Sequence, residues 1–318
     1  MPKPFERALE LAERGRGTTN PNPVVGAVLV AGDDVVGEGW HERAGGPHAE
    51  VVALEAAGER ARGATLYVTL EPCAHHGRTP PCADAIVAAG VARVVVGAPD
   101  PNPKTDGQGL ARLREAGIDV ELLDGGPALR ARRQNEAWRT WIVARRPFVT
   151  YKAAVTLDGR VVVPESRWVT GEESRRRVHE LRAASDAVAV GMGTVRADSP
   201  RLDARDVEAE RQPRRLAFGS GPLAEGSELE LVSGPLAEEL ERLAAADVQS
   251  LLLEGGPTLA TSFLREGLVD KLLLFVAPTL AGSGRRWVDE LGAAFPLSGL
   301  EAERIGDDLL LTGYIREP

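Results

Sequence analysis

The chain has 318 residues, of which 43% are hydrophobic and 27% are charged, and its formal net charge at pH 7 is −9. The length favours two domains, each large enough to bury its own core. No apolar run approaches the roughly 20 residues that cross a bilayer, which argues against a membrane-spanning protein. The negative charge argues against nucleic acid phosphates as the main partner.

The N-terminal composition and the cysteine usage both indicate a cytoplasmic protein. The N-terminus, MPKPFERALELAERG, carries charges throughout and has no apolar core of the kind a secretory signal needs, so we expect a cytoplasmic protein. A disulfide between Cys73 and Cys82, the two cysteines of the chain, would be unusual in a reducing compartment. Metal binding is therefore the preferred interpretation of this pair.

The first half of the chain alternates between helical and extended patterns. Hydrophobic spacing and turn residues predict helices over 3–14, from about His48, and over 81–89, 109–117 and 128–144, and strands over 24–30, 35–39, 64–69 and 91–100. This order indicates an α/β sheet with helices on both faces. The sequence Arg145, Arg146, Pro147 ends the last of these helices, so we place a domain boundary near 145.

The second half repeats the alternation and is also predicted to be α/β. We expect strands over 148–159, 186–190, 214–218, 248–253 and 271–276, and helices over 172–184, 236–246 and 258–266. The charged stretch 199–213 has little apolar periodicity and is predicted to be an exposed loop.

Four residues form a candidate zinc site. A catalytic zinc ion takes three protein ligands and keeps one position open, and His48, Cys73 and Cys82 supply such a set. Glu50 follows the histidine by two residues, and Pro72 precedes the first cysteine, which is the order of the zinc deaminase signature. Eight residues separate the cysteines here, whereas the common form has two.

The expected role of Glu50 is that of the base. It would take a proton from the attacking water and deliver it to the ring nitrogen and the departing ammonia. The alternative is a closed structural zinc site, whose fourth ligand would be His41, His75 or His76.

Several motifs resemble the family of bifunctional riboflavin biosynthesis enzymes, which join a diaminohydroxyphosphoribosylaminopyrimidine deaminase to a 5-amino-6-(5-phosphoribosylamino)uracil reductase. The deaminase half of that family is matched by TTNPNPVVGAV, GEGWHERAGGPHAEVVAL, LYVTLEPCAHHGRTPPCADAI and PDPNPKTDGQG. The resemblance implies a cytidine-deaminase-like zinc domain over 1–145, with zinc on His48, Cys73 and Cys82 and the proton shuttle on Glu50. It further implies that the pyrimidine is contacted by Asn22, His41, His75 and Arg78. Asn22 could equally be a turn residue, and Arg78 a solvated loop charge.

The second half resembles the reductase, through RPFVTYKAAVTLDGR, SRWVTG, LRAASDAVAVGMGTVRADSPRL and LLLEGGPTLATSFL. The resemblance implies a dihydrofolate-reductase-like domain over 146–318 that uses NADPH. Gly255 and Gly256 lie between a predicted strand and a predicted helix, where glycine permits close backbone approach and the helix N-terminus can receive a pyrophosphate. Such an element is often only a turn, and it is not the GxGxxG of the classical dinucleotide fold.

The same resemblance implies two further sets of contacts. Residues expected to line the NADPH site are Ala154, Trp168, Thr194, Asp198, Ser220, Gly256, Pro257, Thr258, Leu259, Ala260, Thr261 and Ser262. Residues expected at the ribose phosphate and sugar are Lys152, Ser166, Arg182, Leu202, Arg205 and Glu254. Arg182 and Arg205 would supply the local positive charge that an acidic chain needs for this anion, whereas Lys152 could also be an edge-strand charge.

The sequence therefore predicts a two-step enzyme. It would deaminate 2,5-diamino-6-ribosylamino-4(3H)-pyrimidinone 5′-phosphate and then use NADPH to reduce the ribosyl group to ribityl. A nucleic-acid base deaminase with an accessory domain is the enzymatic alternative, and a structural zinc module for assembly is the non-enzymatic one. By resemblance the protein is a homo-oligomer, a dimer or a tetramer.

Overall fold

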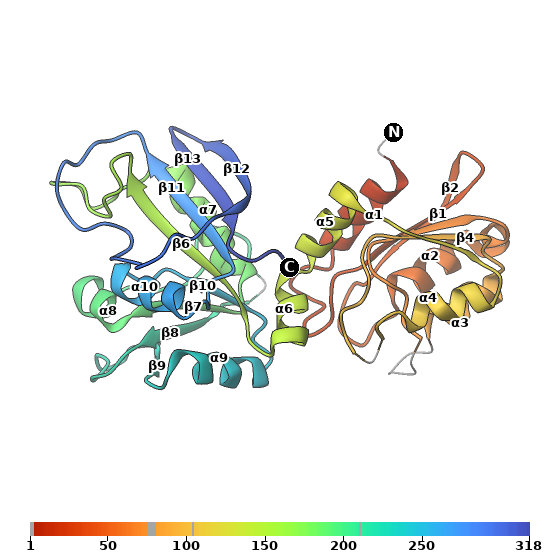
Figure 1. Cartoon of the computed structure of the whole chain (residues 1–318), viewed down its shortest axis with the longest axis horizontal. Helices are drawn as coiled ribbons and strands as arrows, with labels where there is room; N and C mark the ends of the chain where they lie inside the picture. Colours follow the sequence, from red (N-terminus) through yellow and green to blue (C-terminus); the bar gives the residue numbers. More distant parts are fainter. Residues whose placement is uncertain (1–2, 75–80, 104, 210) are drawn as a thin grey trace. The chain divides into compact units, whose positions relative to one another are not determined.

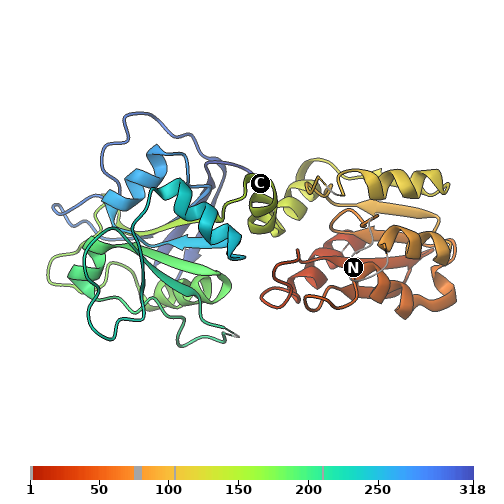
Figure 2. The same ribbon diagram turned by 90° about the horizontal axis from the view of Figure 1, so that it is seen from below.

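The computed structural model describes residues 3–74, 81–103, 105–209 and 211–318. It divides into two compact units, Met1–Ala144 with Pro318 and Arg145–Glu317. Both are α/β, as the alternating patterns predict (Figures 1 and 2). Among the described residues, no helix is long and apolar enough to cross a membrane.

The first unit is built on a five-stranded sheet. In spatial order its strands are β2 (Asp34–Trp40), β1 (Gly26–Ala31), β3 (Thr65–Val68), β4 (Arg93–Val96) and β5 (Asp119–Leu122). Strand β1 is antiparallel to both of its neighbours, whereas β3, β4 and β5 are parallel. The strand predicted over 91–100 is shorter than expected, since β4 covers only four of these residues. The prolines that begin at Pro99 have no N–H for a ladder and could not have extended it to residue 100. The prediction missed β5.

Helices cover both faces of this sheet, as predicted. One face packs against α2 (Ala49–Ala57), α3 (Cys82–Ala89) and α4 (Gln108–Glu115), and the other against α1 (Pro4–Glu13) and α5 (Gly125–Gln134). The unit also contains the 3-10 turn η1 (Gly58–Ala61) and α6 (Glu136–Ala144). Side chains alternate between the two faces along β1. Ala27 and Leu29 pack under α2, α3 and α4, whereas Val28 packs against α1.

The prediction of a single helix over 128–144 is wrong. The structure has two helices, α5 and α6, which are separated at Asn135. The Asn135 side-chain amide donates to the carbonyl of Val24 at 2.8 Å and accepts from its N–H at 2.9 Å. An asparagine that bonds a distant backbone in this way competes with continuation of the helix.

The second unit contains an eight-stranded sheet. In spatial order its strands are β12 (Ser298–Ile305), β13 (Asp308–Tyr314), β11 (Lys271–Ala277), β6 (Phe148–Thr156), β10 (Ser250–Leu253), β7 (Ala187–Gly191), β8 (Arg214–Phe218) and β9 (Glu230–Val232). The strands from β11 to β9 are parallel, and β13 and β12 add antiparallel pairs at one edge. The prediction missed β9, β12 and β13. Strand β12 is exposed along almost all of its length and therefore carries no apolar alternation.

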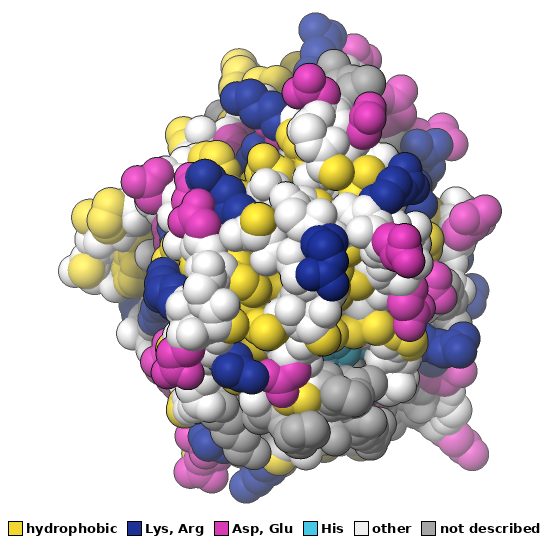
Figure 3. Space-filling model, turned by 90° about the vertical axis from the view of Figure 1, so that its right-hand side faces the viewer, with side chains coloured by type: hydrophobic (Ala, Val, Ile, Leu, Met, Phe, Trp, Pro, Cys, Tyr) yellow, Lys and Arg dark blue, Asp and Glu magenta, His cyan; other side chains and the backbone are white. Residues whose placement is uncertain are grey.

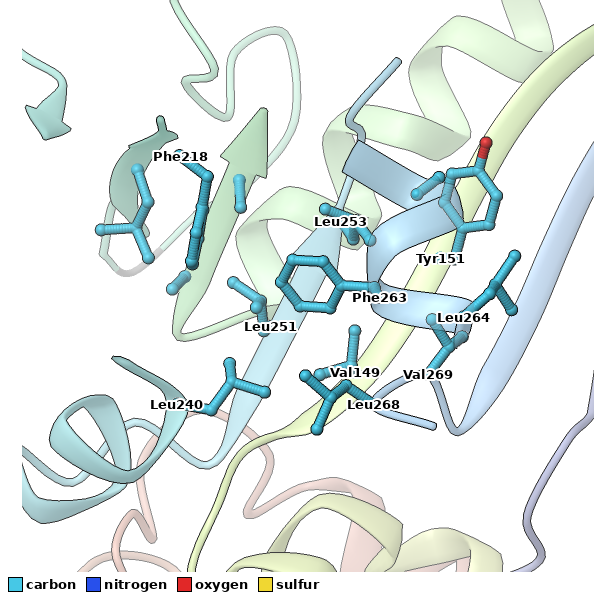
Figure 4. Close-up of a cluster of buried hydrophobic side chains, with 14 of the residues drawn as sticks. Val149, Tyr151, Phe218, Leu240, Leu251, Leu253, Phe263, Leu264, Leu268 and Val269 are labelled. Atoms are coloured by element: carbon cyan, nitrogen blue, oxygen red, sulfur yellow. The ribbon is translucent and has the colours of Figure 1, made fainter. Parts of the chain in front are cut away.

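Helices also cover both faces of the second sheet. On one face, α9 (Leu236–Ala245) and α10 (Pro257–Arg265) bury Leu240 and Phe263 in the largest apolar cluster of the unit, which Figure 4 shows. On the other face, α7 (Glu172–Ala184) packs Val178 against Phe275 of β11. The prediction missed α8 (Met192–Asp198), which follows β7 directly.

A buried carboxylate ties the ends of the second unit together. Asp270 is 1% exposed and accepts two hydrogen bonds from Arg146, at 2.6 and 2.7 Å, and one from the N–H of Val149 at 2.9 Å. Arg316 near the C-terminus reaches the same carboxylate at 3.3 Å. The start of β6, the start of β11 and the C-terminal segment therefore share one buried charge centre.

We expect Asp270→Ala to lower the free energy of unfolding of the second unit by about 3–5 kcal/mol, because it leaves Arg146 buried without its anion. Glu238→Ala is the matched control: Glu238 pairs with Arg242 at 3.6 Å, and both side chains are more than half exposed. Removing that pair costs about 0–1 kcal/mol. Urea unfolding followed by fluorescence measures both, and equal stability of the two variants would contradict the role of Asp270.

Candidate functional site

The first site begins at the N-terminus of α2. His48 is the N-cap residue of this helix, and Glu50 lies in its first turn with 3% of its surface exposed. Two glycines of β2 let the helix approach the sheet this closely. A Cβ on Gly37 would lie 2.2 Å from the carbonyl oxygen of Ala53, and a Cβ on Gly39 would lie 2.4 Å from that of Ala49. Any larger residue at these two positions would push α2 away.

The two cysteines converge on His48 from different elements. Cys73 lies in the segment after β3, and Cys82 is the first residue of α3. The two sulfurs are 3.5 Å apart, and His48 Nδ1 lies 2.9 Å from Cys82 Sγ and 3.6 Å from Cys73 Sγ. The backbone N–H of Cys82 donates to Cys73 Sγ at 3.3 Å, so the N-terminus of α3 faces a sulfur that can carry negative charge.

These three ligand atoms fit a tetrahedral zinc ion. They all lie within 4.8 Å of one another. With Zn–S near 2.3 Å and Zn–N near 2.0–2.1 Å, tetrahedral geometry requires about 3.8 Å between sulfurs and about 3.6 Å between sulfur and nitrogen. Two of the three observed separations lie within a few tenths of an ångström of these values. The donor set of one imidazole and two thiols is also the one that zinc prefers.

The surroundings of the centre separate the pKa values of the two thiols and raise that of Glu50. Hydrogen bonds from the Cys82 thiol and backbone, together with His48, lower the pKa of Cys73 to about 4, whereas the bond to Cys73 and burial raise the pKa of Cys82. Burial raises the pKa of Glu50 to about 7. A carboxyl group with this pKa can both accept and donate a proton near neutral pH.

Two of the predicted pyrimidine contacts lie beside this centre. The His41 ring packs edge-on against His48 with 5.5 Å between centroids. Its Nδ1 donates to the carbonyl of Pro47 at 2.9 Å, and its Nε2 accepts from the Asn22 amide at 3.2 Å. Both ring nitrogens are therefore engaged, which leaves His41 unsuited as a fourth metal ligand. His75, His76 and Arg78 lie outside the described residues.

A cavity of about 1580 Å³ opens in the second unit at the ends of β6, β7 and β10. Most of the residues predicted to bind NADPH or the ribosyl substrate line it: Lys152, Ala154, Trp168, Arg182, Thr194, Asp198, Leu202, Arg205, Glu254, Gly256, Pro257, Thr258 and Leu259. The fold therefore brings together, around one cavity, side chains that are more than 100 residues apart in the sequence.

Three charged side chains form the inner wall of this cavity. Arg182 binds both oxygens of Glu254, at 2.6 and 3.0 Å, and Lys152 Nζ lies 3.7 Å from the same carboxylate. Burial lowers the pKa of Lys152, although Glu254 opposes this effect. Burial alone would raise the pKa of Glu254, but Lys152 and Arg182 outweigh it and hold that pKa below its usual range.

Five of the predicted contacts do not line the cavity: Ser166, Ser220, Ala260, Thr261 and Ser262. The Ser166 hydroxyl donates to the carbonyl of Trp168 at 2.7 Å, and the Thr261 hydroxyl accepts from the N–H of Asp289 at 2.9 Å. These two hydroxyls bond other parts of the protein, and the assignment of all five residues to substrate or cofactor stays a prediction.

The cavity also has lining residues that were not singled out from the sequence, among them Arg175, His179, Arg201 and Arg285. A signal for two of them was present. Arg175 and His179 precede Arg182 by seven and three residues on α7, a spacing that places all three on one face of a helix.

Models of two protein families match this chain. Residues 3–98 match the cytidine and deoxycytidylate deaminase zinc-binding region, and residues 147–311 match the RibD C-terminal domain. Among curated proteins, the riboflavin biosynthesis protein RibD of Aquifex aeolicus is 41% identical and that of Escherichia coli is 40% identical. These alignments cover 96% of this chain and 95% and 96% of the relatives.

Solved structures agree over the same length. RibD of Acinetobacter baumannii, form 1, superposes with a TM-score of 0.87 at 38% identity. A Thermotoga maritima protein described as a diaminohydroxyphosphoribosylaminopyrimidine deaminase/5-amino-6-(5-phosphoribosylamino)uracil reductase superposes with a TM-score of 0.84 at 34% identity. Each covers 98% of this chain and is itself covered to 97%.

We expect His48→Ala and Cys82→Ser to bring the zinc content per chain close to zero, because each removes one of three protein ligands. His41→Asn is the control and should keep its zinc, since both nitrogens of His41 are engaged elsewhere. Elemental analysis of the purified variants measures this. Full zinc occupancy in either ligand variant would show that the ligand set is wrong.

Proposed function

The chain belongs to the RibD family of riboflavin biosynthesis proteins, and we propose that His48, Cys73, Cys82 and Glu50 carry out its deaminase reaction. The enzyme is bifunctional, a zinc-dependent deaminase and an NADPH-dependent reductase. We assign the deaminase to residues 1–145 and the reductase to 146–318. The substrate of the first reaction is then the diaminopyrimidinone ribosyl phosphate, and its product is the substrate of the second.

The burial of Glu50 beside the ligand set is the observation that carries the deaminase proposal. When bound, zinc supplies a Lewis acid that polarises the attacking water. Glu50 accepts a proton from that water as the water oxygen bonds to the amine-bearing ring carbon, and passes this proton to the ring nitrogen. It then takes the proton of the new hydroxyl group and passes it to the leaving amine. The C–N bond then breaks, ammonia departs and a ring carbonyl remains. The pKa of Glu50 suits both transfers.

Asn22 and His41 are proposed to orient the pyrimidine. An amide has both a donor and an acceptor, so Asn22 can read a ring edge that presents the complementary pair. Burial lowers the pKa of His41, and its bonds to Pro47 and Asn22 are those of the neutral ring. Because a neutral imidazole adds no positive charge next to the metal centre, it does not weaken the binding of zinc there.

We expect Glu50→Gln to slow ammonia release by about 10²–10⁴-fold, the usual contribution of a positioned acid–base group. The amide is isosteric and is not a zinc ligand, so zinc content and the reduction of supplied deaminated product should stay at wild-type levels. Ammonia assays, elemental analysis and NADPH oxidation measure the three quantities. Full ammonia release by this variant, or loss of its zinc, would contradict the assigned role.

The reductase is proposed to work in the cavity of the second unit. NADPH supplies the hydride, and Ala154, Trp168, Thr194, Asp198 and the segment 256–259 hold the cofactor. Lys152 and Glu254 lie at the inner wall, where they can hydrogen-bond the sugar being reduced. Arg182 and Arg205 face the same space and supply positive charge for the ribose phosphate.

Gly256 offers a test of where the cofactor lies. A Cβ here meets only Thr194 Oγ1, at 3.4 Å, so a larger side chain can extend toward the cavity without displacing the fold. We expect Gly256→Val to weaken NADPH binding by about ten-fold or more, equivalent to about 1.4 kcal/mol, by excluding the backbone approach of the cofactor.

The matched control for this variant is Gly126→Val, because a Cβ on Gly126 meets no atom within 4 Å and the residue belongs to the first unit. Fluorescence titration gives the dissociation constants of both variants. Unchanged NADPH affinity in Gly256→Val would place the cofactor elsewhere in the cavity.

The two alternatives find little support. A nucleic-acid deaminase would need a basic surface, whereas Figure 3 shows acidic and basic side chains interspersed on the face in view. A structural zinc module would not need a buried carboxylate beside the ligands. We further propose a cytoplasmic location, which suits the two free thiols of the centre, and a homo-oligomeric assembly, which rests on the family alone.

A further inference from the structure

One face of α7 points basic side chains into the reductase cavity. Arg175, His179 and Arg182 follow at intervals of four and three residues and all line the cavity. Arg205, from the segment after α8, lines the same space. An anion that enters between α7 and this segment therefore meets up to four basic groups.

The arginines of this group already have partners. Arg182 is bound by Glu254 through two hydrogen bonds. Arg205 donates to Asp203 at 2.6 Å, and Arg201 reaches the other oxygen of Asp203 at 2.7 Å. Arg175 donates to the carbonyl of Thr170 and lies over the Trp168 ring, 5.1 Å from its centroid. These contacts orient the guanidinium groups but also use part of their capacity to bind a ligand.

His179 differs, because it has no carboxylate partner among the described residues. Its Nδ1 lies 3.1 Å from the carbonyl oxygen of Asp203, to which an Nδ1–H donates, so one ring nitrogen holds the ring against this segment. The backbone nitrogen of Arg205 lies 3.4 Å from the same Nδ1, but its N–H can donate only to the other tautomer. No hydrogen-bond partner of Nε2 is found in the described part of the chain. The second nitrogen is therefore available to a ligand in the cavity.

The surroundings of His179 disfavour the charged form of its ring. Burial, then Arg182 and Arg205, lower the pKa of His179, while the Asp203 carbonyl and Glu254 oppose this. A phosphate ester loses its second proton near pH 6, close to the range of an ordinary histidine. A phosphate oxygen beside Nε2 therefore stabilises the imidazolium, with the proton taken from the phosphate monoanion or from solvent. Nδ1–H keeps its bond to Asp203 while Nε2–H donates to the phosphate.

We propose that Nε2 of His179 is a direct ligand of the 5′-phosphate of the reductase substrate, together with Arg182 and Arg205. This inference rests on the proposed placement of the ribosyl substrate in the cavity. Arg182 and Arg205 are each paired with a carboxylate of the protein, whereas His179 is a basic group of the proposed phosphate site without such a pair among the described residues.

The test compares two amide substitutions in the full-length, zinc-loaded enzyme. The amide nitrogen of Gln can occupy the position of Nε2, whereas that of Asn can occupy the position of Nδ1. We expect His179→Asn to raise the KM for the deaminated intermediate about ten-fold, as expected for a lost hydrogen bond to a charged group. His179→Gln should raise it by a smaller factor. Neither variant should change kcat, ammonia release or the dissociation constant of NADPH.

Ribose 5-phosphate serves as a probe of the phosphate alone. Its inhibition constant should rise in His179→Asn by the same factor as the KM. Ribose, which lacks the phosphate, should inhibit the wild-type enzyme and all variants equally. Arg177→Gln is the matched control on α7: Arg177 does not line the cavity, is about half exposed and pairs with Glu180 at 3.2 Å. It should behave as wild type in all assays.

Three results would overturn the inference. They are an unchanged KM in both variants, a better rescue by Asn than by Gln, and a loss of NADPH affinity in both variants. The second and third would indicate that the ring only holds the Asp203–Arg205 segment in place. Failure of the wild-type enzyme to oxidise NADPH with the intermediate would instead reject the proposed function of the second unit.

Discussion

The close packing of α2 on β2 is the constraint on which the deaminase site depends. Glycine at 37 and 39 lets the helix backbone lie against the strand, so that its N-terminus delivers His48 to the metal position and buries Glu50 beside it. The N-terminus of α3 delivers Cys82 to the same point and donates a backbone N–H to Cys73. Two helix N-termini thus meet at a pair of thiols, and their dipoles favour the negative charge that a metal ion requires.

In the second unit, the charges of the cavity must accommodate anionic ligands. The chain carries a net charge of −9, yet its proposed substrate and cofactor are both anionic. Charge is therefore arranged locally: Lys152 and Arg182 share Glu254, and Arg201 and Arg205 share Asp203. Each carboxylate holds basic groups in fixed positions before any ligand binds, which reduces the ordering that binding requires. Burial and the two neighbouring guanidinium groups lower the pKa of His179, so that a phosphate beside Nε2 would favour its charged form.

Much of the fold could be predicted from local patterns, and the zinc centre from residue order, because His48, Glu50, Cys73 and Cys82 are chemically specific. Some of the elements that were missed lack such signals. Strand β12 is exposed, and the break between α5 and α6 depends on a bond from Asn135 to Val24, more than 100 residues away in sequence. His179 carries a helical spacing to Arg182, but only the tertiary structure shows that this face of α7 lines a cavity. The same holds for Ser166 and Ser220, whose position outside the cavity no motif could reveal.

The central claim is that two separate sites on one chain act in sequence, so that the first product is the second substrate. The most direct measurement is NADPH oxidation by Glu50→Gln, started either with the diaminopyrimidine or with its deaminated product. The account predicts little oxidation with the diaminopyrimidine and wild-type oxidation with the deaminated product. Oxidation at the wild-type rate with the diaminopyrimidine would contradict the account, because reduction would then not require prior deamination at the zinc centre.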